Sequence, residues 1–263
     1  MLVVAPGRSL GALETAWMLR IGGCEADVTI VEAQGLPFWV REEGAVLHLT
    51  DAAPVAAAVL PSGRGPVPEG LAAILPNLRA VESVLASGFA DGSALVEFPA
   101  LLMSGPAIGS GAVPVPMGGT PLEENRTFAA LIGPEQWNLI VGLAAERAAV
   151  AAAFGVRHVP DAEAMIASHA GAARGAGSRP QPDLAQSKQL LRDGVIGSLV
   201  PLVSAAEMAG IAVPMTQAMI TLASGVLGAD VAAAGRRLDT IGITAAGMET
   251  ARQMMDAIAT GGR

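Results

Sequence analysis

Glu97 is the residue whose position in the sequence most favours chemistry. It lies in the apolar run LVEFPALLM, residues 95–103. A carboxyl group that its neighbours remove from water is a candidate general acid or base near neutral pH. The alternative is that Glu97 faces solvent or pairs with an arginine at the end of an element. The sequence leaves both interpretations open.

Two neighbouring pairs of opposite charge are further candidates. Arg192 and Asp193 could anchor a substrate carboxylate or ketone, and the alternative is a surface ion pair before a helix. Glu146 and Arg147 stand among alanines, which favours a local pair at a helix packing interface over a site.

Aromatic, sulfur-containing and imidazole side chains give weaker signals. Trp39 follows Pro37-Phe38 and could line a pocket. Methionines such as Met103 usually fill gaps in a core, although Met-bearing helices around a cleft would suit an apolar ligand. His158 and His169 flank a short predicted helix, which favours surface or capping roles over ligand roles.

The composition excludes several classes of protein. The formal net charge is −8 and no basic stripe is present, so we expect no nucleic-acid partner. Charged or polar residues interrupt every apolar stretch before the roughly 20 residues that span a bilayer, so we expect no membrane partner. No basic region precedes the apolar start, which favours a cytoplasmic protein. One cysteine and three scattered histidines predict neither an intrachain disulfide nor a metal site.

The first part of the chain has the pattern of an α/β fold. Residues 2–5, 10–21 and 27–32 read as strand, helix and strand, which is typical of a parallel sheet. Residues 45–49 and 54–60 have the pattern of a hairpin. The sequence therefore predicts that more strands join the first two.

The rest of the chain has the pattern of an all-α domain. A Gly/Pro-rich connection at residues 105–121 separates the two patterns. We therefore predict an α/β domain at 1–104 and a helical domain at 122–263. The helices predicted after the connection span residues 136–154, 161–169 (with an acidic N-cap), 184–191, 200–209, 215–227 and 246–260.

Five stretches carry a family resemblance. They are PGRSLGALE at 6–14, VTIVEAQGLPFWVR at 28–41, GLAAERAAVAAAFGV at 142–156, the run GSLVPLVSAAEMAGIAVPMTQAMITLASGVLG at 197–228 and GRRLDTIGI at 235–243. In this order they resemble the octopine/nopaline (opine) dehydrogenases. The resemblance implies a partial Rossmann-like sheet followed by a helical domain like the C-terminal domain of opine and 6-phosphogluconate dehydrogenases.

The chain departs from this family at the cofactor. Family members begin with a glycine-rich phosphate loop within roughly the first hundred residues of a Rossmann module. The segment from Gly7 to Gly11 follows a strand but matches the family's later Pro-Gly turn. We therefore expect no cofactor, the alternative being NAD or NADP bound through a module that is missing from this chain.

A second departure concerns the residues that the family uses for proton transfer and substrate binding. The resemblance places Glu97 where the family has histidine and Ser93 where it has asparagine. It places Gln189 and Gly194 where the family has arginine and aspartate, with Arg192 and Asp193 displaced beside them. The resulting prediction is Glu97 and Asp193 as catalytic, and Arg192, Gln189, Ser93, Met103 and Trp39 as substrate-binding.

Three functional interpretations stay open at this point. The first is a cofactor-independent, non-redox enzyme that cyclises or isomerises a largely apolar, polyfunctional small molecule in secondary metabolism. The second is an NAD(P)-dependent opine-type dehydrogenase whose N-terminal cofactor module is missing from this chain. The third is a non-catalytic binding protein that forms a homodimer through its helical domain.

Overall fold

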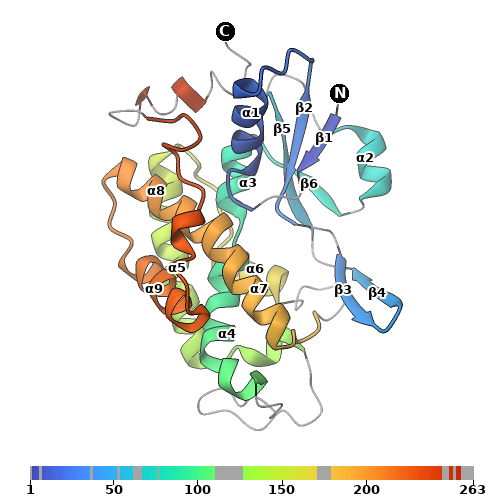
Figure 1. Cartoon of the computed structure of the whole chain (residues 1–263), viewed down its shortest axis with the longest axis vertical. Coiled ribbons are helices and arrows are strands. Elements are labelled where there is room, and N and C mark those ends of the chain that lie inside the picture. The colour runs from blue at the N-terminus through green and yellow to red at the C-terminus, as the bar shows by residue number, and fades with distance from the viewer. Residues whose placement is uncertain are drawn as a thin grey trace.

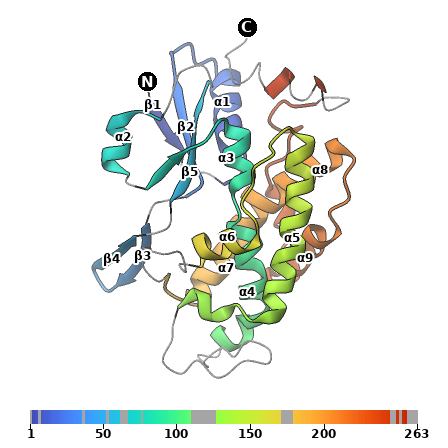
Figure 2. The ribbon, with the colours of Figure 1, turned by 180° about the vertical axis from the view of Figure 1, so that it is seen from behind.

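The computed structural model of the chain joins a small sheet to a larger helical layer, side by side (Figures 1 and 2). It describes residues 2–5, 8–35, 38–51, 54–61, 67–75, 77–109, 127–170, 179–244, 249–250 and 253–255.

The sheet has four strands in the order β1-β2-β5-β6. β1 pairs with β2 in parallel, as the predicted βαβ unit requires, and α1 connects the two. β5 joins β2 antiparallel and β6 joins β5 parallel, so the sheet is mixed. The elements are β1 (Leu2–Ala5), α1 (Gly11–Ile21), β2 (Thr29–Ala33), β5 (Val55–Leu60), α2 (Glu69–Ile74), β6 (Leu78–Ala80) and α3 (Val84–Ala90).

The predicted hairpin of residues 45–49 with 54–60 is wrong. β4 (Val46–Asp51) pairs instead with β3 (Phe38–Glu43) in a separate two-stranded sheet. β5 is apolar over almost its whole length, and Ala56–Leu60 are buried, so it lies inside the main sheet. Burial of β5 therefore overrides pairing with its neighbour in sequence.

Helices cover both faces of the main sheet. α1 and α3 lie on the face toward the helical layer, and α2 lies on the opposite face (Figures 1 and 2). On the inner face Leu13 and Ile30 share a buried cluster with Phe154 and Leu202 of the helical layer. The sheet is therefore joined to the helices by a continuous apolar core.

The helical layer is built around α4 (Ser93–Gly109). α4 packs against α5, α6, α7 and α9, and its residues 94–101 are all buried. A Cβ at Gly194, on α7, would lie 2.6 Å from the ring of Phe98, so the missing side chain lets α7 approach α4 closely. The other helices are α5 (Pro134–Ala153), α6 (Ala162–His169), α7 (Leu184–Gly194), a π-helical turn η3 (Val195–Leu199), α8 (Val200–Ala209), α9 (Pro214–Leu227) and the short 3₁₀ turns η2 (Phe128–Leu131) and η4 (Ala232–Ala234).

Val84–Met103 is long and apolar enough to cross a membrane by length and composition alone. However, 83% of its apolar window is buried inside the protein, as in the core helix of a soluble protein. Residues 105–109, which the sequence placed in a linker, belong to α4, and residues 110–126 lie outside the described residues.

The predicted acidic N-cap of α6 is confirmed, because the Asp161 side chain accepts a hydrogen bond from the backbone N–H of Ala164 at 2.8 Å. A buried carboxylate closes the start of α1 in a similar way. Glu32 of β2 accepts from the N–H of Ala12 at 2.7 Å and from Nε2 of Gln34 at 2.9 Å. Burial raises the pKa of Glu32 to about 7, despite these hydrogen bonds.

We predict that Glu32→Gln changes how stability depends on pH. The fold raises the pKa of Glu32 from 4.5 to about 7, so its contribution is fully present below pH 4.5 and is lost as pH rises through 7. This loss amounts to at most about 3 kcal/mol. Urea unfolding from pH 4.5 to 7.5 should show a flatter profile for Glu32→Gln than for the wild type. Parallel profiles would contradict the assignment, whatever their constant offset.

Candidate functional site

Glu97 lies between two arginines from distant parts of the chain. Its carboxylate accepts from Nη2 of Arg179 at 2.7 Å and from Nη2 of Arg8 at 3.3 Å, and it is only 3% exposed. Arg8 follows β1, Glu97 belongs to α4, and Arg179 precedes α7. Glu97 is therefore both removed from water and paired with arginine, and its catalytic role stays a prediction.

The guanidinium of Arg179 is held by aromatic rings stacked on it as well as by hydrogen bonds at its edge. Its guanidinium carbon lies 4.8 Å from the ring centroid of Trp39 and 4.0 Å from that of Phe128. Its Nη1 donates to the carbonyl oxygen of His169 at 2.7 Å. Two cation–π contacts and two hydrogen bonds therefore fix the plane of this guanidinium.

A second buried carboxylate, that of Asp91, helps to position Arg8 beside Glu97. It accepts from Oγ of Ser93 and Oγ of Ser198, both at 2.5 Å, and Arg8 donates from Nη1 to Oγ of Ser93 at 2.9 Å. Burial alone would raise the pKa of Asp91, but the charge of Arg8 and the two hydroxyl hydrogen bonds outweigh it and lower the pKa. Asp91 is therefore an ionised acceptor that positions Ser93 and, through it, Arg8.

Glu97, its two arginines and Ser93 lie on the wall of a cavity of about 360 Å³ at the junction of the sheet and the helices. The cavity is next to the carboxyl ends of the parallel strands β1 and β2, where open α/β sheets commonly bind ligands. Three arginines and one glutamate line it, which gives a net charge of +2 (three positive, one negative). The lining residues include Arg8, Arg79, Arg179, Glu97, Ser93, His169, Gln34, Phe38 and Trp39.

His169 contributes no charge to this cavity near neutral pH. Burial lowers the pKa of His169 to about 4, although the charges of Asp91 and Glu97 act in the opposite direction. His169 lies in the last turn of α6 and is one of the residues that line the cavity, and the surface or capping role predicted for it stays a prediction. As a neutral ring it carries one hydrogen-bond donor and one acceptor.

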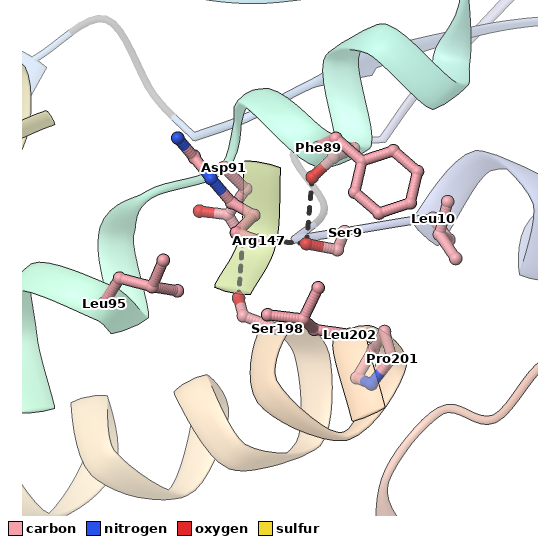
Figure 3. A pocket seen from close by; sticks show the side chains of 10 residues that line it. Ser9, Leu10, Phe89, Asp91, Leu95, Arg147, Ser198, Pro201 and Leu202 are labelled. Atoms are coloured by element: carbon pink, nitrogen blue, oxygen red, sulfur yellow. Dashed lines mark hydrogen bonds between the residues drawn. The ribbon is translucent and has the colours of Figure 1, made fainter. Parts of the chain in front are cut away.

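A much smaller pocket, of about 10 Å³, is lined in part by Asp91 (Figure 3). Ser9, Asp91 and Ser198, joined by hydrogen bonds, form its polar wall, and Arg147 borders it. This volume has room for about one water molecule. It therefore belongs to the packing around Asp91 rather than to a ligand site.

The predicted local pairing of Glu146 with Arg147 is wrong, although both are structural, as expected. The Glu146 carboxylate caps α9 by accepting from the backbone N–H groups of Met215 at 2.8 Å and Thr216 at 2.9 Å. Arg147 is 2% exposed and donates to the carbonyl oxygen of Pro160, and burial lowers its pKa to about 10. Neighbours on a helix point in different directions, so the two side chains separate.

Comparison with known proteins identifies the fold. No family model and no curated protein matches the chain. Octopine dehydrogenase with NADH and pyruvate is similar over 100% of this chain and 71% of its own, with a TM-score of 0.64 and 19% identity. Yersinopine dehydrogenase with NADP⁺ bound is similar over 99% of this chain and 71% of its own, with a TM-score of 0.58 and 12% identity. The chain has an opine dehydrogenase-like fold.

The expectation that no cofactor is involved is wrong for this fold. Octopine dehydrogenase was solved with NADH, and yersinopine dehydrogenase with NADP⁺, which points to a nucleotide cofactor for proteins of this fold. The described residues do not cradle its phosphates, however. The helix that follows β1 is α1, and its first turn is already occupied by the Glu32 carboxylate at Ala12. A phosphate at this helix N-terminus would compete with Glu32 for the backbone N–H and, above the pKa of about 7 of Glu32, would also meet its negative charge.

The opine dehydrogenase-like fold brings together only some of the predicted site residues. Ser93, Glu97 and Trp39 line the main cavity. Gln189 lines an adjacent cleft of about 280 Å³ that shares Trp39 with the main cavity. Their roles stay predictions.

The other predicted residues lie outside the lining of the main cavity. Asp193 is hydrogen-bonded to Nε2 of Gln189 at 2.8 Å on an exposed part of α7. Arg192 is exposed, and Met103 is 37% exposed on α4. The residues that sequence reasoning missed are Arg8, Arg79, Arg179, Asp91 and His169. A carboxylate in an apolar run is compatible with a cation nearby, but no spacing indicates which one.

We predict that Glu97→Ala is strongly destabilising. It would leave Arg8 and Arg179 buried without their shared counter-charge, for a loss of about 3–5 kcal/mol in the free energy of unfolding. The matched control is Glu207→Ala, because Glu207 pairs with Arg237 at the surface, where both side chains are at least 40% exposed. The control should cost less than about 1 kcal/mol. Equal losses in urea unfolding would show that Glu97 does not hold the two arginines.

Proposed function

We propose that the chain binds a small anionic metabolite in the cavity around Glu97 and acts on it as a nucleotide-dependent oxidoreductase of the opine dehydrogenase type. The observation that carries the proposal is the net positive lining of this cavity in a chain whose own net charge is −8. Low-dielectric walls focus the field of such a lining, which favours anions over cations.

Arg8 and Arg179 are the anchors for the anion. An arginine has five N–H donors, and Glu97 and the His169 carbonyl use two of them on Arg179. Trp39 and Phe128 keep the guanidinium in one plane, so little freedom is lost when a carboxylate binds. Glu97 is a positioning residue in this proposal, because it orients both arginines.

The nucleotide supplies a hydride when it is bound. The contribution of this chain is to hold the substrate, keep water from it and offer a proton-handling group. His169 is the candidate for the last role, because it lines the same cavity as Arg8 and Arg179 and a neutral imidazole can donate one hydrogen bond and accept another. The nucleotide phosphates would be held outside the residues that the structure describes.

A second candidate function is cyclisation or isomerisation of a small molecule. It is favoured by Glu97, which lies in the cavity where the family resemblance places a histidine. Holding a flexible substrate in a reactive conformation can supply much of such a rate. The charged lining favours a substrate with at least one anionic group over a wholly apolar one.

Titration calorimetry with NADH, NADPH and pyruvate tests the proposal. We expect one nucleotide to bind and pyruvate to bind with it. Arg179→Lys should weaken the binding of pyruvate at least about tenfold. Lysine keeps the positive charge but loses the planar guanidinium that stacks on two rings and can donate two parallel hydrogen bonds. Arg237→Lys, at the surface, should change nothing.

Two other outcomes have definite meanings. Pyruvate binding without binding of either nucleotide would favour the cyclase or isomerase function. An Arg179→Lys protein that binds pyruvate as tightly as the wild type would contradict the role given to the cavity.

A further inference from the structure

Among the residues that the structure describes, two buried polar atoms on the lining of the main cavity have no hydrogen-bond partner. They are Oε1 of Gln34 and Nε1 of Trp39. A buried donor or acceptor without a partner costs about 1–3 kcal/mol. The two atoms are complementary in kind, since one accepts and the other donates.

The orientation of the Gln34 amide is determined by its neighbours. Its Nε2 donates to Oε1 of Glu32 and to Oγ of Ser87, both at 2.9 Å. Turning the amide over would place its oxygen against the Glu32 carboxylate, so Oε1 is the atom left unpaired. Gln34 therefore presents an acceptor that needs a donor from elsewhere.

The orientation of Trp39 is determined by the cation stacked on it. Arg179 lies 4.8 Å from its ring centroid, so the indole face is already used. The indole N–H lies at the edge of that ring and can only donate. Trp39 therefore needs an acceptor from elsewhere.

We propose that Gln34 and Trp39 form a subsite for a carboxamide carried by the ligand, which rests on the proposed function for the anionic part of that ligand. A carboxamide donates from its N–H to Gln34 and accepts at its oxygen from Trp39. An ester lacks the N–H donor that Gln34 requires. An ammonium group would be repelled by a cavity lining that contains three arginines and one carboxylate. Both atoms are covered in this structure, so the ligand engages them after neighbouring side chains move aside, while the Gln34 amide and the Trp39 ring keep their contacts.

The carboxamide could come from the substrate or from the nicotinamide of a nucleotide, and the probes separate these sources. Succinamate carries a carboxylate and a carboxamide, monomethyl succinate replaces the amide by an ester, and nicotinamide mononucleotide carries the amide on a nicotinamide. The chain has three tryptophans, so the indole N–H region of a ¹H–¹⁵N spectrum reports Trp39 directly once Trp39→Phe assigns its signal. Spectra are recorded at pH 8, above the pKa of about 7 of Glu32.

We expect succinamate or nicotinamide mononucleotide to shift the Trp39 signal and succinamate to bind at least about tenfold tighter than monomethyl succinate. A shift with succinamate alone assigns the subsite to the substrate, and a shift with the mononucleotide assigns it to the nucleotide. Gln34→Leu should abolish the preference for amide over ester. Trp39→Phe, which keeps a ring for Arg179, should weaken the binding of the amide-bearing probe. The matched control is Trp137→Phe, because the Trp137 side chain is 41% exposed.

The subsite would be overturned if neither amide-bearing probe moved the Trp39 signal, or if both variants kept the preference of the wild type. Failure of the anion site has a different signature. In that case butyramide, the uncharged counterpart of succinamate, would move the Trp39 signal as strongly as succinamate does.

Discussion

The carboxylate of Glu97, shared by Arg8 and Arg179, is the interaction on which the rest of the structure around the cavity depends. It joins the turn after β1, the central helix α4 and the segment before α7. Each partner has a further anchor, since Asp91 positions Arg8 through Ser93 and two aromatic rings hold Arg179. Buried charges are tolerated only when they are paired and hydrogen-bonded, and that requirement determines how these three segments meet.

Acidic side chains elsewhere in the core serve the backbone. Glu32 closes the start of α1 and Glu146 closes the start of α9, where N–H groups without helical partners need acceptors. These two carboxylates therefore occupy helix ends, while three arginines gather at the cavity. As a result, a cavity with a net positive lining exists in a protein whose overall charge is −8.

The fold and the chemistry are supported by different observations. Similarity to octopine and yersinopine dehydrogenases at 12–19% identity establishes an opine dehydrogenase-like fold. It also corrects the expectation that no cofactor is involved, because those structures hold NADH or NADP⁺. The substrate is a separate question, since one fold can host many reactions and the side chains of the site decide among them.

The sequence by itself determined the α/β-then-helical order, the βαβ unit at β1-α1-β2 and the acidic cap of α6, because local periodicity and capping depend on neighbouring residues. It also marked Glu97 as either a desolvated acid–base candidate or a residue that faces solvent or pairs with an arginine. Only the tertiary structure decided that Arg8 and Arg179, separated from Glu97 by 89 and 82 positions, are those partners. It also placed β5 beside β2 and His169 in the cavity. Such contacts depend on how distant segments pack, which no local pattern records.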